Sequence, residues 1–117
     1  MNYQKRFSLI EQRFVSARAN PPAEHFAVQI TLTGNDAGIF YIANTPRGFE
    51  VAPYDYRDNT AALTISGDDL VRFLGGRLHL DRALESGRIQ FTGNADHIRL
   101  LAQIADSPTP RNRKETI

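Results

Sequence analysis

Residues 60–93 carry the clearest pattern of apolar and polar positions in the chain. Positions 60–65 alternate between the two kinds of side chain, which is typical of a half-buried strand. Ser66 follows as a favoured helix N-cap, and two aspartates come soon after it, where they suit the positive end of a helix dipole. The next apolar residues fall on one helical stripe, namely Leu70, Val71, Phe73 and Leu74. The pattern predicts a strand followed directly by an amphipathic helix.

Glycines divide the rest of this region. Gly75 and Gly76 are expected to end the helix, because glycine adopts the left-handed C-terminal conformation without a Cβ clash. A second short helix, capped by Asp81 and closed by Gly87, should follow. Positions 88–92 then alternate again, which predicts a further strand.

Upstream of this region, periodicity predicts one helix and three strands. Apolar residues recur every three or four positions over 2–18, which indicates an amphipathic helix. Segments 25–33, 39–44 and 49–52 are predicted strands joined by two tight turns, which implies an antiparallel meander. Residues 39–42 are apolar on both faces, as in a central strand covered on both sides, and the N-terminal helix is a candidate for the second cover.

The remaining segments are a loop, a last helix and a tail. Loop 53–59 carries two tyrosines, which either guard the mouth of a pocket or lie on the surface, as loop aromatics commonly do. Asn94 is a good N-cap for a closing helix whose apolar stripe includes Ile98, Leu101 and Ile104. Prolines and charges dominate the C-terminus, so we expect one domain over 1–106 and a disordered tail over 107–117.

Composition narrows the functional classes. A net charge of +1 argues against a strong nucleic-acid binder. The absence of cysteine excludes disulfides, thiolate catalysis and Cys-ligated zinc, and it fits a reducing cytoplasm. No apolar run approaches the roughly 20 residues of a membrane-spanning helix, and the N-terminus lacks the apolar region of a secretory signal. We therefore expect a cytoplasmic protein with no nucleic-acid partner.

Basic residues gather at the two ends of the chain. Residues 1–20 carry a net charge of +3 and residues 106–117 carry +1, which leaves −3 for the middle, since the whole chain carries +1. One interpretation is a solvated helix face and tail. The other is a basic patch on the N-terminal helix that contacts anionic lipid headgroups.

The residues that could carry chemistry form no recognisable catalytic or metal-binding pattern. His25, His79 and His97 lie far apart and lack the ligand spacing of a metal site. The serines show no nucleophile elbow, and the adjacent acids at 68–69 would point in different directions at a helix start. Segment 34–38 contains glycines but not the lysine or the spacing of a phosphate loop. We expect no catalytic residue, no metal and no cofactor.

The order and spacing of these motifs resemble the sterol carrier protein type 2 family of lipid-binding domains. The family pattern is a strand, a polar cap with acidic residues, a helix ending in Gly-Lys/Arg-Leu, and an Ala-to-Gly segment that leads into an alternating strand. The corresponding runs here are Ser66-Gly67-Asp68-Asp69-Leu70, Gly76-Arg77-Leu78 and residues 83–93. The resemblance extends over roughly residues 25–105. Leu84 departs from the pattern, since the family often has Phe there.

The resemblance implies an α+β fold with a five-stranded, mostly antiparallel mixed sheet and helices packed mainly on one face. The first three strands would form the meander, and the last two would lie beside strand one. A hydrophobic tunnel between sheet and helices would hold a fatty-acyl, sterol-like or isoprenoid lipid. The residues expected to contact this lipid are Ile30, Leu32, Leu70, Phe73, Leu74, Leu84, Phe91, Ile98, Leu101 and Ile104.

Three functions are compatible with this interpretation. The first is non-enzymatic binding or transfer of an apolar lipid, with transient membrane contact through the basic N-terminal helix. The alternative is an accessory or scaffold domain that presents lipid or quinone intermediates to a partner enzyme. An enzyme that uses the cavity is the third, and it would need Tyr41, Tyr54 or His97 to point inward.

Overall fold

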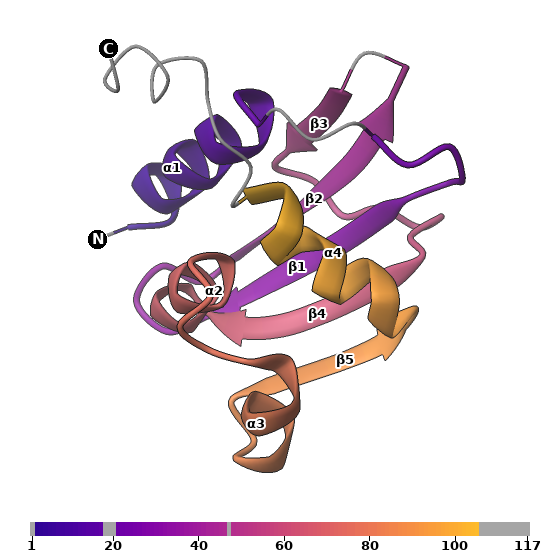
Figure 1. The fold of residues 1–117 in the computed structure, drawn as a ribbon. Helices are drawn as coiled ribbons and strands as arrows, with labels where there is room; N and C mark the ends of the chain where they lie inside the picture. Colours follow the sequence, from indigo (N-terminus) through magenta and orange to yellow (C-terminus); the bar gives the residue numbers. More distant parts are fainter. Residues whose placement is uncertain (1, 18–20, 47, 106–117) are drawn as a thin grey trace, which may run out of the picture.

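The computed structural model describes residues 2–17, 21–46 and 48–105 of the 117-residue chain (Figure 1). These residues form α1 (Tyr3–Val15), β1 (Ala27–Thr33), β2 (Gly38–Thr45), β3 (Gly48–Ala52), β4 (Ala61–Ser66), α2 (Gly67–Leu74), α3 (Leu80–Glu85), β5 (Ile89–Gly93) and α4 (Ala95–Ala105). The predicted helices and strands are all present, with ends that differ by a few residues. The predicted tail over 107–117 lies outside the described residues.

Strand β1 lies at the centre of the sheet, whose order is β3-β2-β1-β4-β5. It pairs antiparallel with β2 and parallel with β4, and the two outer pairs are antiparallel. The expected mixed, mostly antiparallel sheet is confirmed, and so is the position of the last two strands beside β1. Strand β2, whose residues 39–42 were predicted to be apolar on both faces, is an interior strand between β3 and β1.

The register assigns alternate residues to the two faces of the sheet. Val28 pairs with Ile42 on one side and with Ala61 on the other, so the three side chains share a face. Across all strands this face holds Val28, Ile30, Leu32, Phe40, Ile42, Val51, Ala61, Leu63, Ile65 and Ile89, all buried. The other face carries mainly polar residues, among them Gln29, Thr31, Thr64 and Gln90.

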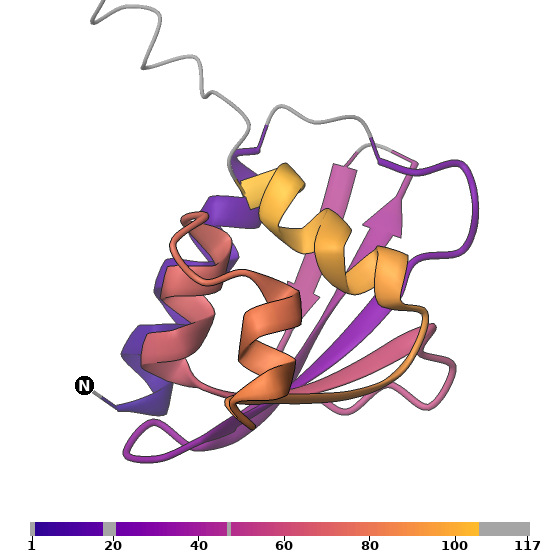
Figure 2. The ribbon, with the colours of Figure 1, turned by 60° about the horizontal axis from the view of Figure 1, so that its bottom comes forward.

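The four helices of the described chain all cover the apolar face (Figure 2). Phe7 of α1 meets Phe40 of β2 edge-on, with ring centroids 5.7 Å apart. The rings of His97 in α4 and Phe26 have centroids 5.0 Å apart, and Phe26 precedes β1 on the same face. The hypothesis that α1 could cover the second face is therefore wrong. Its aromatic stripe packs where the strands present apolar side chains, and only one face does so.

The polar face is partly covered by the connection over 53–60, which has to cross the sheet because β3 is an edge strand and β4 lies beyond β1. Tyr56 in this connection packs on Tyr41, with ring centroids 4.7 Å apart, and its N–H donates to Gln29 Oε1 at 2.8 Å. Tyr54 is 65% exposed. Tyr56 thus lies on the face away from the helices, and the hypothesis that it guards a pocket between sheet and helices is wrong.

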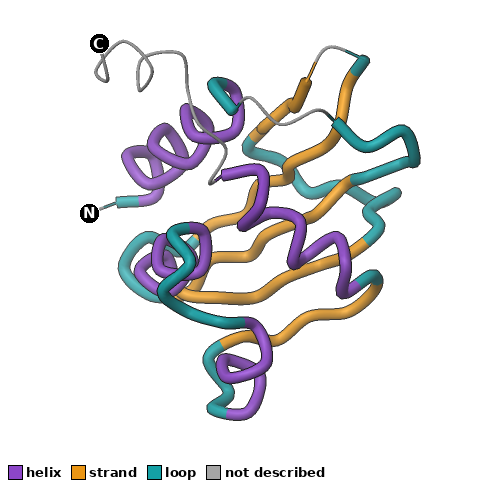
Figure 3. The backbone as a smooth tube through the Cα atoms, in the orientation of Figure 1, coloured by secondary structure: helices purple, strands orange, loops and turns teal. Residues whose placement is uncertain are grey.

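Side-chain caps fix most of the helix starts, and Figure 3 shows where along the backbone each helix begins. Side-chain oxygens accept hydrogen bonds from backbone amides three positions further on at Asn2, Ser66 and Asn94. The cap predicted for α3 is wrong. This helix begins at Leu80 with His79 at the N-cap position, and Asp81 lies inside its first turn. The carboxylate still suits the positive end of the helix there, which is why the sequence alone does not distinguish the two positions.

Candidate functional site

A crevice of about 230 Å³ opens where α2, α3 and α4 meet above the apolar face of the sheet. It is lined by Phe73, Gly76, Leu78, His79, Leu80, Asp81, Arg99 and Ala102. Phe73 and Leu80 form its floor and belong to the core, since they are only 3% and 5% exposed. The rim is polar and carries an imidazole, a carboxylate and a guanidinium. The crevice therefore leads from a charged rim directly to core side chains.

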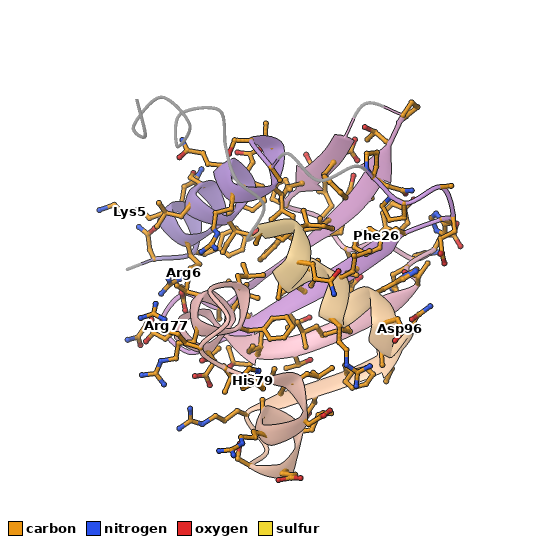
Figure 4. All side chains as sticks on the ribbon, viewed as in Figure 1. Lys5, Arg6, Phe26, Arg77, His79 and Asp96 are labelled. Carbon is orange, nitrogen blue, oxygen red and sulfur yellow. The ribbon has the colours of Figure 1, made fainter. Side chains whose placement is uncertain are left out.

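The sequence builds this crevice by turning the chain sharply after α2. Gly76 adopts a φ of +77°, and its N–H donates to Phe73 O at 3.2 Å. The N–H of Arg77 donates to Arg72 O at 2.8 Å, which completes the hydrogen bonds of a Schellman motif. Residues 77–79 then separate α3 from α2, and His79 lies at this junction (Figure 4). The predicted glycine stop is thus one wall of the crevice.

The structure brings most of the ten predicted lipid-contact residues into one core. Nine of them lie in the apolar cluster between sheet and helices or pack against it, namely Ile30, Leu32, Leu70, Phe73, Leu74, Phe91, Ile98, Leu101 and Ile104. Leu84 is 38% exposed on α3 and lies outside this cluster. Phe73 also lines the crevice. Contact of all ten residues with a ligand stays a prediction.

Of the residues that line the crevice, only Phe73 was predicted to contact the lipid. The residues not predicted are Gly76, Leu78, His79, Leu80, Asp81, Arg99 and Ala102. A signal existed for the last two, because they are three positions apart and so share one face of α4. Arg99 was not identified, because in the sequence it is one of many charged residues of the kind that lie on the surface. The position of Arg99 opposite α3 depends on how α3 and α4 pack together. The spacing of apolar residues within either helix does not predict that packing.

A second hollow of about 390 Å³ lies between α1 and α2. Its floor includes Ile10 and Val71, and its rim is the polar face of α1. Leu9 borders this hollow and a neighbouring one of about 320 Å³, and it is 49% exposed. Arg13 also lines the hollow, and its Nη2 donates to Leu74 O at 3.4 Å. This side of the molecule combines exposed aliphatic and basic groups.

Arg6 holds α1 against the rest of the domain. Its Nε lies 2.6 Å from Asp36 Oδ2 in the turn between β1 and β2, and its Nη2 lies 2.8 Å from Asp68 Oδ1 at the start of α2. The side chains of Arg6 and Asp36 are only 10% and 8% exposed. Arg6 was expected to lie on a solvated or lipid-facing basic surface, and the structure instead places it in a buried ion pair.

His97 is the buried histidine of the described chain, and it acts as a cross-link. Its Nδ1 lies 2.6 Å from Thr60 Oγ1, and its Nε2 lies 3.1 Å from Glu24 Oε2. The Thr60 hydroxyl is also hydrogen-bonded to the N–H and the carbonyl of Ala27, at 3.1 and 3.0 Å. A hydroxyl held by the backbone on both sides is a poor nucleophile, so this acid–imidazole–hydroxyl chain connects α4 to β1 and does not resemble a working triad.

Two tyrosines have shifted pKa values. Burial raises the pKa of Tyr3, whose hydroxyl donates to Ile39 O at 2.6 Å. The hydrogen bond that Tyr41 donates to Glu50, followed by burial, raises the pKa of Tyr41 to about 12. Both shifts favour the neutral phenol, so neither tyrosine is activated as a base at neutral pH.

Neither a metal-binding cluster nor a membrane-spanning helix occurs among residues 2–17, 21–46 and 48–105. Within these ranges no three histidine, aspartate or glutamate side chains are grouped so that they could hold a metal ion. The same residues include no helix with the length and hydropathy needed to cross a bilayer.

Several solved structures share this fold at low sequence identity. The stereoselective inverting sec-alkylsulfatase Pisa1 from Pseudomonas sp. superposes with a TM-score of 0.70 and 12% identity, over 89% of this chain and 16% of that chain. This chain thus spans about a sixth of the sulfatase. Sterol Carrier Protein 2 Like 2 from Aedes aegypti superposes with a TM-score of 0.63 and 18% identity, over 86% of this chain and 94% of that chain. The ubiquinone synthesis protein UbiJ-SCP2 superposes with a TM-score of 0.64 and 14% identity, over 89% of this chain and 88% of that chain.

Comparison at the level of sequence families extends this likeness. Comparison with curated proteins gave no match. A family model described as the SCP-2 sterol transfer family matches residues 10–106, from the middle of α1 past the end of α4. The match includes the whole sheet and the three helices that form the crevice. Because it covers well over half of the sequence, the chain belongs to the SCP-2 sterol transfer family.

Proposed function

We propose that this protein binds the apolar tail of one lipid between the sheet and the helices and transfers it without chemical change. The observation that carries the proposal is the crevice between α2, α3 and α4, whose floor of Phe73 and Leu80 is continuous with the core. A tail that passes the charged rim meets apolar side chains directly below it. Membership of a family described by sterol transfer supports the same class of ligand.

Burial of the tail would supply the affinity. Each buried methylene contributes about 0.8 kcal/mol, so a ten-carbon stretch would contribute about 8 kcal/mol before the costs of association. About 8 kcal/mol corresponds to a micromolar dissociation constant. Selectivity among tails would then depend on the shape of the cavity.

The ligand would have to widen the crevice. At about 230 Å³ it is smaller than the roughly 300–1,000 Å³ typical of small-molecule pockets. We infer that α3 moves outward to admit a full tail. This helix has only six residues and lies between Gly76 and Gly87, which both have left-handed φ values, +77° and +76°.

A bulky side chain in the crevice tests the proposal. Ala102→Trp places an indole among the lining residues, whereas Gln103→Trp adds the same group at an exposed position of α4. Titration with a fluorescent fatty acid should show that Ala102→Trp binds at least roughly tenfold more weakly than the natural chain. This corresponds to a loss of about 1.4 kcal/mol or more in the free energy of binding. Binding by Gln103→Trp should equal that of the natural chain.

The same two variants distinguish a blocked site from an unfolded protein. The natural chain contains no tryptophan, so each variant carries a single indole whose emission reports its own surroundings. Circular dichroism should be the same for all three proteins. If Ala102→Trp keeps its fold and binds the fatty acid as tightly as the natural chain, the lipid does not enter here. Leu101 is unsuitable for this test, because it is fully buried and a polar residue there would unfold the core.

We further propose that α1 contacts the membrane during transfer. Leu9 and Val15 are 49% and 64% exposed on this helix, and Lys5 and Arg13 accompany them. Exposed aliphatic groups next to basic ones suit the interface of an anionic bilayer. Leu9→Ser should reduce sedimentation with phosphatidylserine-containing vesicles. Equal sedimentation with neutral and anionic vesicles would argue against this contact.

A second candidate function is that of an accessory domain, and the similarity to UbiJ-SCP2, a ubiquinone synthesis protein, favours it. In this role the chain would present a lipid or quinone intermediate to a partner enzyme. Transfer of labelled lipid between vesicles by the isolated protein supports the carrier. A stoichiometric complex with an enzyme, together with no transfer between vesicles, supports the accessory role. In either role the absence of cysteine suits a reducing compartment such as the cytoplasm.

A further inference from the structure

We propose that Arg99 selects lipids with an anionic head, and that its guanidinium exchanges Asp81 for that head when the tail enters the crevice. The inference rests on the proposed function, since it concerns the same crevice. It adds a ligand class and a residue that determines specificity.

Arg99 and Asp81 lie on opposite walls of the crevice. Arg99 belongs to α4 and Asp81 to α3, and Nη2 of the guanidinium is 3.4 Å from Oδ1 of the carboxylate. Nη1 is also 3.4 Å from Oδ1 of Asp96. Both distances exceed the roughly 2.7–2.9 Å of a charge-assisted hydrogen bond. Each aspartate thus engages one nitrogen at long range, and neither uses the planar fork of the guanidinium.

Solvent exposure makes these two contacts exchangeable. The side chain of Arg99 is 49% exposed, and those of Asp81 and Asp96 are 80% and 90% exposed. Ion pairs between groups this exposed contribute little to stability, because water competes for both partners. Arg99 can therefore leave Asp81 at little cost.

An anionic head would use this guanidinium better than Asp81 does. Carboxylate and phosphate groups accept two parallel N–H bonds from arginine. The apolar floor lies just below, because Phe73 and Leu80 line the same crevice and Ala102 is one helical turn from Arg99 on α4. A tail bound to this floor would bring its head to the rim. His79 adds an imidazole there, for which the described residues provide no hydrogen-bond partner.

Arg6 and Arg13 also border hollows, but they lie on the α1 side of the molecule and not at the crevice. Arg6 is held by buried Asp36, and Arg13 contacts the carbonyl of Leu74 at 3.4 Å. A neutral head such as a hydroxyl would gain little from Arg99, since it offers one weak acceptor and no charge to replace that of Asp81. The geometry therefore points to an anion and away from a neutral alcohol.

Paired probes that differ only in the head test this inference. Pyrene-labelled dodecanoic acid carries a carboxylate, and pyrene-labelled dodecanol carries a hydroxyl on the same tail. The full-length natural chain should bind the acid about tenfold more tightly than the alcohol at low salt, which corresponds to about 1.4 kcal/mol. The preference should shrink as salt screens the exposed charges.

Three variants separate the head contact from other effects. Arg99→Gln should bind the two probes equally, with the affinity for the alcohol unchanged. Asp81→Asn, which removes the competing carboxylate, should bind the acid more tightly than the natural chain does. Arg82→Gln, which removes an exposed arginine of α3 outside the crevice, should keep the natural preference.

The outcomes separate this inference from the carrier proposal. If the natural chain binds neither probe, the carrier proposal fails and takes the inference with it. Tight binding of both probes without preference overturns the assignment of Arg99 alone. A folded Arg99→Gln that loses acid and alcohol equally also overturns it, because the residue would then support the crevice and not the head. Competition by dodecyl phosphate and dodecyl sulfate shows which anionic head the site prefers.

Discussion

Two arginine–aspartate pairs of the same chemistry do different work at two places in this molecule. Arg6 and Asp36 are about nine-tenths buried, and their nearest atoms are 2.6 Å apart. Arg99 and Asp81 are half to four-fifths exposed, and their nearest atoms are 3.4 Å apart. The first pair fastens α1 to the turn before β2, and the second bridges α3 and α4 across the crevice.

Burial decides which of the two pairs is permanent. A buried charge that loses its partner is left without either water or a counter-ion, so the pair stays closed. An exposed charge that loses its partner is solvated at once, so the pair can exchange. The comparison implies a domain with one fixed end, at α1 and α2, and one end that can open, at α3.

The largest expected effect comes from breaking the buried pair. Asp36→Ala leaves Arg6 buried beside an empty site, and we expect a loss of about 3 kcal/mol in the free energy of unfolding. Urea denaturation followed by circular dichroism measures this loss. Asp68 remains near Arg6, which keeps the value at the lower end of the range for buried pairs.

The exposed partner of the same arginine provides the control. Asp68 has a side chain that is 90% exposed, so Asp68→Ala should cost less than about 1 kcal/mol. If the two substitutions cost the same, burial does not set the strength of these contacts, and the comparison above loses its basis.

A glycine beside the buried pair gives the second largest effect. A Cβ at Gly67 would overlap Asp36 Oδ2 and crowd Arg6 Nε, so Gly67→Ala should push the pair apart. We expect a loss of roughly 1–3 kcal/mol, as for other overpacked sites. The loss should shrink when Asp36 is already alanine, and a double-mutant cycle measures this coupling. Additive losses would mean that the strain lies in the backbone and not in the pair.

The pattern of apolar and polar residues was sufficient to predict the helices and strands, but it contained no signal for the two ion pairs. Alternation at 28–32 and 61–65 marks strands whose inward residues are all buried, and Ser66 caps α2 as expected. These signals are local, because each depends on residues a few positions apart. The strand order came from the family resemblance, since periodicity does not state which strands are neighbours.

The ion pairs and the crevice were not predictable, because they join residues distant in sequence. Arg6 is 30 positions from Asp36, and Arg99 is 18 positions from Asp81. Arg6 counted as one of several basic residues of an amphipathic helix, and nothing local marks it as buried. The cover of the polar face was missed for a similar reason, since it follows from the crossing between β3 and β4.

A smaller effect is expected from the exposed pair. Arg99→Ala should change the free energy of unfolding by less than about 1 kcal/mol, because its ion pairs are long and solvated. Thermal or urea unfolding would measure it beside Asp36→Ala. A loss as large as that of Asp36→Ala would show that Arg99 is structural and that α3 is fixed rather than free to open.

The smallest effect concerns a third polar pair, Tyr41 and Glu50 on the face away from the helices, and it appears only at alkaline pH. The hydrogen bond to Glu50 is the main cause that raises the pKa of Tyr41 to about 12, above the roughly 10 of an unfolded chain. The folded state therefore holds the phenol proton more tightly than the unfolded state does. This contribution to stability is complete below pH 10 and is lost as pH rises towards 12.

Glu50→Ala should remove most of this pH dependence. Without the hydrogen bond, the pKa of Tyr41 should fall towards about 10, and the absorbance titration of the tyrosinate should shift accordingly. Tyr41→Phe identifies which of the four tyrosines is responsible. The natural chain should lose stability more steeply than Glu50→Ala between pH 10 and 12. An unchanged titration in Glu50→Ala would mean that burial, and not the Glu50 carboxylate, raises the pKa of Tyr41. The exposed hydrogen bond would then contribute even less to stability than its geometry suggests.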